Sequence, residues 1–91
     1  MLSKNKVKIK NKTGLHARPA AQFVQKASNF DSEINIIYDG QEVNAKSIMG
    51  VMSLGIGQGS EILLKAEGDD SETALEELSR YIEVKMPEED N

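Results

Sequence analysis

The sequence predicts an α+β fold in two layers, with four short, largely antiparallel strands in one sheet and helices on one face of it. Two stretches repeat apolar residues at three- and four-residue steps, which is typical of helices with one buried stripe. Other short segments alternate apolar and polar residues, which favours half-buried strands. The expected order is strand, helix, strand, strand, helix, strand, helix, in a single domain over residues 1–91.

The first strand and the first helix follow from these two periods. Residues 6–10 alternate lysines with Val7 and Ile9, so these two side chains are expected to be buried and the lysines to face water. The helix is expected from about residue 17 to residue 28, with Asn29 as a left-handed stop. Its buried stripe comprises Ala20, Phe23, Val24, Ala27 and Phe30.

A hairpin is expected next. Residues 33–38 predict a strand with Ile34, Ile36 and Tyr38 on one face, and residues 41–45 predict the returning strand. Between them, Asp39 and Gly40 form a pair that favours a tight turn. These two strands are therefore antiparallel.

Residues 47–54 predict a short helix that begins after Ser47, a good N-cap residue. Its apolar residues Ile48, Met49 and Met52 cluster on about one side. Glycines at positions 55, 57 and 59 follow. A phosphate-cradling glycine loop lies between a strand and a helix, whereas these glycines follow a helix and precede a strand, so they indicate a C-cap and a loop.

The last strand and the last helix complete the sheet and its cover. Residues 61–66 predict a strand with Ile62, Leu64 and Ala66 directed inward, while Ile37 and Leu63 fall on the open sheet face and are expected to be partly exposed. Acids and a capping oxygen at residues 69–72 mark a helix start. The stripe of that helix comprises Ala74, Leu75, Leu78, Tyr81 and Ile82. Residues 86–91 are expected to be a disordered acidic tail.

Composition excludes several functional classes. The chain has no cysteine and one histidine, so it offers neither a disulfide framework nor a zinc site, and no metal is expected. A net charge of -4 argues against a nucleic-acid partner. There is no apolar run of membrane-spanning length and no secretion signal, so we expect a cytoplasmic protein with no membrane partner.

The only histidine, His16, is expected at the mouth of the first helix. The first backbone N–H groups of a helix have no partner inside it and the helix dipole adds partial positive charge there, so an anion is favoured. Arg18 adds a guanidinium suited to phosphate oxygens, and Gly14 supplies freedom for a tight entry. A lone histidine at a helix start is more often a cap or a solvated side chain, which is the alternative.

Two separated motifs extend this interpretation. Residues 14–19, Gly-Leu-His-Ala-Arg-Pro, and residues 43–55, Val-Asn-Ala-Lys-Ser-Ile-Met-Gly-Val-Met-Ser-Leu-Gly, resemble the active-site and regulatory segments of the HPr phosphocarrier family of the bacterial sugar phosphotransferase system, in its Gram-positive type. The resemblance spans about residues 5–84. It implies an open-faced sandwich with a four-stranded antiparallel sheet and three helices on one face, the first and last lying side by side.

The resemblance also implies the chemistry. His16 would accept a phosphoryl group from enzyme I and pass it to sugar-specific enzyme IIA components. Arg18 and the backbone amide of Ala17 would stabilise the phosphate. The sequence shows no general base, cofactor site or substrate pocket, so the chain is expected to be a phosphoryl carrier and not an enzyme.

Regulation is implied at a second residue. By the same resemblance, Ser47 would be phosphorylated by an HPr kinase/phosphorylase. A serine before a short helix is usually only a cap, and an apolar stripe is usually core. A helix this short cannot bury every apolar side chain, however, so Ile48, Met49 and Met52 are expected to form a partner-binding surface with His16 and Arg18.

Two alternatives remain. Several stretches also resemble Crh, the catabolite-repression branch of the family, which lacks the active-site histidine. A Crh-like chain that kept His16 would act mainly through phosphorylated Ser47, as corepressor of a carbon-catabolite repressor protein. The other alternative is a small α/β interaction domain without phosphate chemistry.

Overall fold

The structure, a computed structural model, describes residues 1–89. Within them the chain forms strands, helices and one π-helical turn, η1, in this order: β1 (Leu2–Lys8), α1 (Ala17–Ala27), β2 (Glu33–Tyr38), β3 (Gln41–Asn44), α2 (Ile48–Ser53), β4 (Glu61–Glu67), α3 (Ser71–Arg80), η1 (Tyr81–Lys85) and α4 (Met86–Glu89). The first seven match the predicted order.

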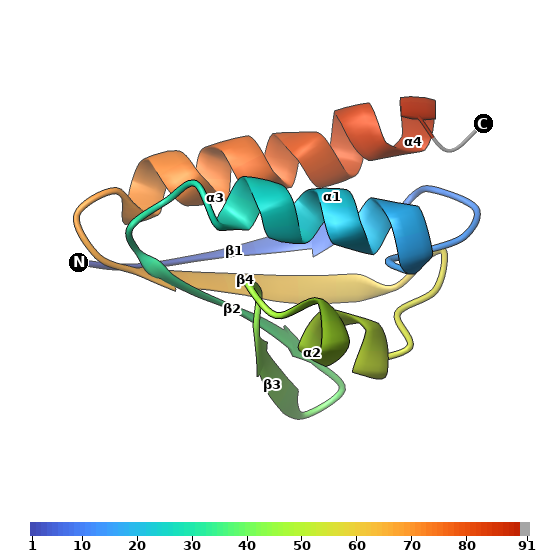
Figure 1. The fold of residues 1–91 in the computed structure, drawn as a ribbon, viewed down its shortest axis with the longest axis horizontal. Helices are drawn as coiled ribbons and strands as arrows, with labels where there is room; N and C mark the ends of the chain where they lie inside the picture. Colours follow the sequence, from blue (N-terminus) through green and yellow to red (C-terminus); the bar gives the residue numbers. More distant parts are fainter. Residues whose placement is uncertain (90–91) are drawn as a thin grey trace.

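The four strands form one antiparallel sheet in the order β1-β4-β2-β3. The last strand in the sequence, β4, therefore lies inside the sheet and pairs on both sides. Helices α1 and α3 lie side by side across the sheet, and α2 packs against α1 and β3 (Figure 1). The predicted α+β class and the implied open-faced arrangement are both confirmed.

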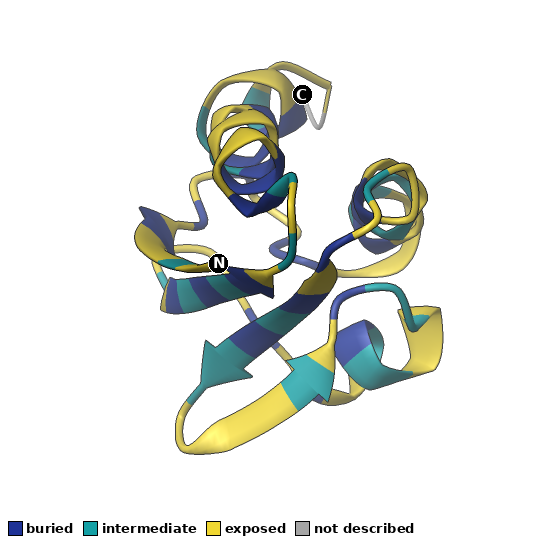
Figure 2. Cartoon of the chain, turned by 90° about the vertical axis from the view of Figure 1, so that its left-hand side faces the viewer, coloured by how far each residue is buried: buried dark blue, intermediate teal, exposed yellow. Residues whose placement is uncertain are grey.

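The core lies between the sheet and the helices, which all cover one face (Figure 2). The residues predicted to point inward from the outer and central strands are buried: Val7, Ile9, Ile34, Ile36, Ile62, Leu64 and Ala66. The stripe of α3 and η1 is also buried, from Ala74 to Ile82 at the predicted helical spacing. On the open face Ile37 and Leu63 are half-buried, as the alternation predicts.

Strand β1 begins at Leu2, earlier than the alternation predicted. Its first residues pair with the far end of β4, where Leu2 lies opposite Glu67. The side of β1 that faces the helices carries polar residues here, and α3 provides their partners. The Ser3 and Ser71 hydroxyl groups lie 3.1 Å apart, and the Asn5 amide donates to the Ser79 hydroxyl at 2.6 Å. A pattern of alternating apolar residues cannot predict a strand segment that is held by polar contacts of this kind.

The C-terminal end of α1 differs from the prediction. Asn29 was expected in the left-handed region, but only Ala17 and Asp39 have positive φ among the described non-glycine residues. The helix ends instead at Ser28, whose backbone N–H and hydroxyl both donate to the Val24 carbonyl. After it, the Asn29 and Phe30 N–H groups donate to the Lys26 and Ala27 carbonyls, so these i→i−3 bonds satisfy the last turn without a left-handed residue.

The β2–β3 turn confirms the hairpin prediction. Asp39 has φ 52° and Gly40 has φ 79°, both in the left-handed region. Two successive positive φ values are typical of the type I′ turn, whose twist matches that of paired strands.

The expected disordered tail is wrong for residues 86–89. These residues form α4, and Met86 is fully buried, with its backbone N–H donating to the Tyr81 carbonyl. A methionine side chain in the core fixes this turn, although the residues after it are acidic and polar. Residues 90–91 lie outside the described part of the chain.

Asp70, one of the polar residues expected at the start of α3, makes no capping hydrogen bond to the helix. It occupies the N-cap position, but its carboxylate reaches across to the α1–β2 connection. There it accepts hydrogen bonds from the Asp31 amide at 2.9 Å, from the Ser32 amide at 3.0 Å and from the Ser32 hydroxyl. These bonds, the Ser32 hydroxyl foremost, hold the pKa of the Asp70 carboxyl below its ordinary value.

We expect Asp70→Asn to lower the melting temperature at pH 7, because an amide cannot accept three bonds with the same geometry. The folded-state pKa lies below the ordinary value of 3.8, so the stability that Asp70 contributes is present above pH 3.8 and is lost as the pH falls through the lowered pKa. Thermal unfolding from pH 7 downward should show the two proteins converging at acid pH. Asp69→Asn, an exposed neighbour, is the matched control, and an equal effect there would contradict the assignment.

Candidate functional site

The loop that leads to His16 is held against the glycine-containing loop after α2. Backbone bonds join the two loops at Ile9 and Leu15: Gly59 donates to the Ile9 carbonyl at 2.7 Å, and Leu15 donates to the Ile56 carbonyl at 3.0 Å. The Gln58 amide adds a bond to the Lys10 carbonyl. The glycine run, predicted as a cap and a loop, therefore also buttresses the histidine loop.

Gly14 is required by both backbone conformation and space. Its φ is 70°, and an added Cβ would overlap the Ile56 carbonyl oxygen and the backbone of Gly57. Its carbonyl accepts a 2.6 Å bond from the buried Asn11 amide. The predicted tight entry is thus a close approach of two backbones that only glycine allows.

We expect Gly14→Ala to destabilise the fold by more than the roughly 1–2 kcal/mol of a left-handed alanine, because backbone overlap adds to that strain. Gly40→Ala is the matched control, since Gly40 has φ 79° and open space around its Cα. Thermal melting of both variants separates the two contributions, at about 4–8 °C per kcal/mol for a domain of this size. Equal decreases in melting temperature for the two variants would show that the close approach of Gly14 to Ile56 does not affect stability.

His16 is the N-cap residue of α1. Its backbone is extended, with φ -141° and ψ 150°, and its exposed side chain makes no capping hydrogen bond. The imidazole is therefore not engaged as a cap, which is the more ordinary role of a polar residue at this position. His16 directly precedes the first-turn N–H groups of α1, which have no carbonyl partner inside the helix.

Ala17, the first residue of α1, has φ 48°. For an alanine this conformation is strained by about 1–2 kcal/mol, and such residues concentrate at functional sites. The family resemblance pointed to the Ala17 backbone amide, but nothing in the sequence indicated this backbone conformation, because alanine is an ordinary helix former. Arg18 follows it, exposed, in the same first turn.

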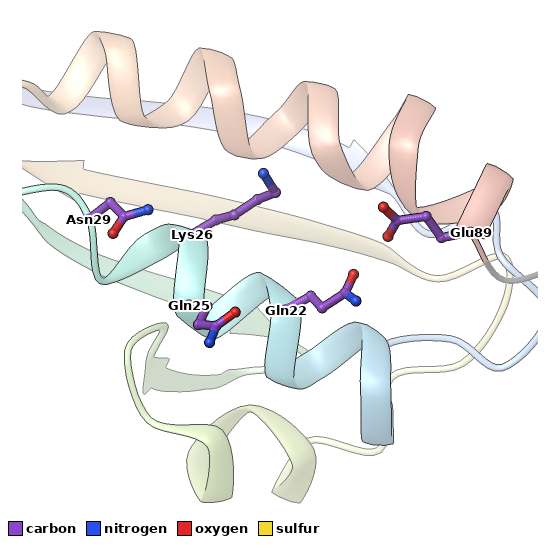
Figure 3. A pocket seen from close by; sticks show the side chains of 5 residues that line it. All are labelled: Gln22, Gln25, Lys26, Asn29 and Glu89. Atoms are coloured by element: carbon purple, nitrogen blue, oxygen red, sulfur yellow. The ribbon is translucent and has the colours of Figure 1, made fainter.

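A polar groove between α1 and the C-terminal turns lies farther along the same helix (Figure 3). Its lining residues are Gln22, Gln25, Lys26, Asn29 and Glu89. The buried Tyr81 hydroxyl donates toward Gln22 at 2.9 Å and lies 3.3 Å from a Glu89 oxygen. Burial, with help from Glu89, raises the pKa of Tyr81 to about 12, while the Arg18 charge opposes the shift.

Ser47 caps α2 as predicted. Its hydroxyl oxygen accepts a 3.1 Å hydrogen bond from the Gly50 amide. The preceding residue is also fixed, because the Lys46 ammonium donates to the Phe30 carbonyl at 2.7 Å. Ser47 is half-buried. It caps α2, and α2 packs against α1, the helix that begins after His16. The two residues therefore stand at the starts of two neighbouring helices.

The three apolar residues of α2 do not share one environment. Met49 is 79% exposed and Ile48 is 39% exposed, whereas Met52 is only partly exposed and packs against the core. The Met49 side chain is therefore available for contact with another protein, whereas Met52 also contributes to the packing of the core.

The described residues hold no group of three or more histidine, cysteine, aspartate or glutamate side chains placed to bind a metal ion. Within the same part of the chain, no helix has both the length and the apolar character needed to cross a membrane.

Comparison with known proteins places the chain among phosphocarriers. Residues 3–84 match the family model described as the PTS HPr component phosphorylation site. The chain is 61% identical over 77 residues to the HPr-like protein Crh of Halalkalibacterium halodurans, covering 85% of this chain and 92% of the relative. It is 57% identical over 75 residues to the phosphocarrier protein HPr of Buchnera aphidicola, covering 82% and 88%. The crystal structure of HPr from Bacillus anthracis superposes with a TM-score of 0.88 at 52% identity, covering 90% and 98%.

Proposed function

Because the chain belongs to the HPr family of phosphotransferase-system phosphocarriers, which are not catalytic enzymes, we propose that it carries its phosphoryl group on His16, received from enzyme I and delivered to enzyme IIA components. The observation that carries this assignment is the exposed imidazole of His16 at the N-cap of α1, without a capping bond. We place the carrier in the cytoplasm, where its phosphotransferase partners act.

In the proposed transfer, an imidazole nitrogen of His16 attacks the phosphorus atom of the donor. A new N–P bond forms, the bond between phosphorus and the donor breaks, and its electron pair stays with the donor. The dianionic group then lies beside the amides of the first turn of α1, Ala17 included, and within reach of Arg18. A helix terminus stabilises charge by about 0.3–1 kcal/mol, which suits a group that must leave again.

Incubation with enzyme I and phosphoenolpyruvate tests the proposal, with acid-labile phosphate as the readout. Acid lability separates a phosphohistidine from a phosphoserine. Absence of any label on a folded protein would refute the carrier function.

The second proposed role is regulatory. HPr kinase/phosphorylase would phosphorylate Ser47, and the phosphorylated chain would then serve a carbon-catabolite repressor protein as corepressor. The position of the Ser47 hydroxyl at the start of α2 supports this role. The negative charge of a phosphate on it would lie near backbone amides and not against a buried apolar group. Crh relatives at 61% and 51% identity make this role a candidate for the main one.

Met49 and Met52 provide a test of the proposed docking surface formed by Ile48, Met49 and Met52. We expect Met49→Ala to leave unfolding within about 0.5 kcal/mol of wild type and to weaken binding to enzyme I. Met52→Ala should also lower stability, by less than the roughly 2–5 kcal/mol of a fully buried methionine. Titration calorimetry and thermal melting measure the two effects. If Met49→Ala binds enzyme I as tightly as wild type does, α2 is not part of the interface.

A further inference from the structure

Strand β1 lies at one end of the sheet, so one of its two long edges has no neighbouring strand. The hydrogen bonds show which backbone groups point toward that free edge. Just after β1, the Ile9 N–H donates inward, to the Ser60 carbonyl at 2.8 Å. Strand residues alternate in direction, so the odd-numbered residues of β1 bond to β4, and the even-numbered ones direct their N–H and C=O groups outward.

One of the outward amides already holds a carboxylate. The Lys8 N–H donates to Oε2 of Glu83, on η1, at 3.2 Å. Within residues 1–89 the outward backbone groups of Lys4 and Lys6 have no comparable partner. The free edge is therefore open from Leu2 to Lys6 and closed at Lys8. Unpaired edge groups of this kind are a template for pairing with another chain.

The side chains along the free edge are basic. Val7 points into the core, so the even-numbered lysines beside it point to the open sheet face. Three of them are exposed in β1: Lys4, Lys6 and Lys8. They repeat about every 6.6 Å, the spacing of every second residue in an extended chain. All fifteen acidic residues of the chain come after residue 30, so β1 carries no acid of its own.

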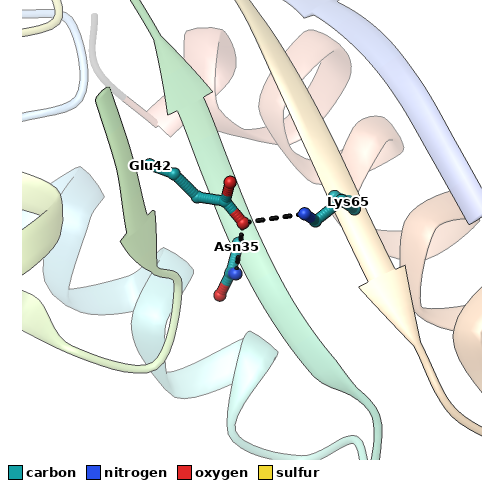
Figure 4. A network of polar contacts seen from close by, with 3 residues as sticks. All are labelled: Asn35, Glu42 and Lys65. Atoms are coloured by element: carbon teal, nitrogen blue, oxygen red, sulfur yellow. Dashed lines mark hydrogen bonds and ion pairs between the residues drawn. The ribbon is translucent and has the colours of Figure 1, made fainter. Parts of the chain in front are cut away.

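The strand next to β1 leaves two of these lysines without a counter-ion within the described residues. Lys6 lies opposite an apolar residue of β4, and Lys4 lies opposite Lys65. Lys65 is itself neutralised by Glu42, whose carboxylate accepts from it at 2.9 Å (Figure 4). Of the three lysines, only the last has an acid, Glu61, opposite it. The uncompensated positive charge of the free edge is therefore concentrated at Lys4 and Lys6.

Helix α3 borders the other side of the free edge, and its flank there is acidic. Ser79 and Glu83 both contact β1, the first by accepting a 2.6 Å bond from the Asn5 amide. Glu72 and Glu76 precede Ser79 on the same helical stripe, at steps of four and three residues, and both are exposed. A strand added to β1 would therefore meet lysines on one face and glutamates on the other.

We propose that the free edge of β1 binds an extended acidic segment of another protein as an added antiparallel strand. Antiparallel pairing continues the pattern of the whole sheet. Acidic residues at alternate positions of the segment lie opposite Lys6 and Lys4, and the residues between them, which face the glutamates of α3, are uncharged or basic. Leu2 is 52% exposed at the end of the edge, so an apolar residue completes the segment.

The same charges disfavour two other occupants. A second β1 strand would bring lysines opposite lysines, and charged side chains of this kind commonly protect edge strands against self-association. A single-stranded nucleic acid supplies negative charge but no N–H donors in strand geometry for the Lys4 and Lys6 carbonyls. An acidic peptide satisfies both the backbone groups and the side chains of the edge.

The proposal is tested by titrating the isotope-labelled full chain with a synthetic peptide, acetyl-Thr-Glu-Thr-Glu-Thr-Val-Thr-amide, and following the backbone amides by NMR. In the antiparallel register its glutamates lie opposite Lys6 and Lys4, and its valine lies opposite Leu2. We expect saturable shifts and slowed hydrogen exchange at the Lys4 and Lys6 amides, because each gains a carbonyl acceptor. The peptide N-methylated at both glutamates keeps its charge but lacks the paired donors, so its dissociation constant should be about tenfold higher or more.

The contribution of charge is tested in the protein. The double variant Lys4→Gln with Lys6→Gln removes the two cations that face the acids, and we expect it to raise the dissociation constant about tenfold at low salt. Lys12→Gln with Lys85→Gln is the matched control, because it changes the net charge equally at exposed residues outside β1. The control should bind within about twofold of wild type. Both double variants change only exposed side chains, and thermal melting verifies that they fold.

Four results would each overturn the proposal. The first is an absence of shifts at the Lys4 and Lys6 amides at millimolar peptide, and the second is equal binding of the N-methylated peptide. The third is equal binding of the peptide by wild type and by Lys4→Gln with Lys6→Gln. The fourth is tighter binding of an oligothymidylate of the same charge, which would assign the lysine row to nucleic acid.

Discussion

Replacing His16 with alanine is expected to abolish enzyme I-dependent phosphorylation completely while leaving the melting temperature within a few degrees of wild type. The reason is chemical: His16 is the only histidine of the chain, so no other imidazole can form the N–P bond. The reason for intact folding is structural, because the side chain is exposed and makes no capping bond. Labelling with phosphoenolpyruvate and enzyme I, alongside thermal unfolding, measures both.

Ser47→Ala is the control for that experiment, because it removes the other proposed phosphate acceptor and should keep the acid-labile label. It should lose about 1 kcal/mol of stability as an N-cap deletion. Full labelling of His16→Ala would reject His16 as the carrier residue, whatever the family match.

Phosphorylation of Ser47 is expected to slow transfer to His16 by roughly 10²-fold. The added group carries about -1.5 to -2 charges and sits at the start of α2, beside the exposed Ile48 and Met49. A partner surface shaped for these apolar side chains would have to desolvate the dianion, and an acidic one would be repelled. A loss of about 2.7 kcal/mol in transition-state binding corresponds to that hundredfold change.

Rates of His16 labelling should be compared between unmodified and Ser47-phosphorylated protein over a range of enzyme I concentrations. Ser47→Asp should reproduce part of the inhibition, since it carries less charge and fewer acceptor oxygens. Ser53→Asp adds the same charge at the other end of α2 and is the matched control. Equal rates for modified and unmodified protein would leave Ser47 as an ordinary helix cap.

Strands and the hairpin were predictable because their signals are local. Val7, Ile34 and Ile62 mark burial by alternation, and the pair Asp39-Gly40 demands a turn with two positive φ values. The capping role of Ser47 was also readable, because it depends on a hydroxyl three residues before a free amide.

Two features that the sequence did not reveal depend on distant partners. Asp70 is of a residue type that is common at helix N-caps, but its carboxylate accepts hydrogen bonds from Asp31 and Ser32, which are far away in the chain. Met86 looked like the start of a solvated tail, but it fills a space in the core. Neither contact has a spacing that a local pattern could detect.

The same limit applies to the candidate site. The sequence predicted that His16 and Arg18 lie at the start of a helix, and the structure confirms that position. It did not reveal that Ala17 is strained or that the residue 56–59 loop supports the entry. Those facts depend on two backbones meeting after the sheet has formed.

The strand order β1-β4-β2-β3 has a consequence for how the molecule folds. Only the β2–β3 pair is local, whereas β1, made first, cannot pair until β4 has left the ribosome. Contacts that distant in sequence slow folding, because loop-closure entropy is lost before they form. Until β4 inserts, no strand joins β1 to β2, so we expect the pairing of β4 with both neighbours to be a late step in folding.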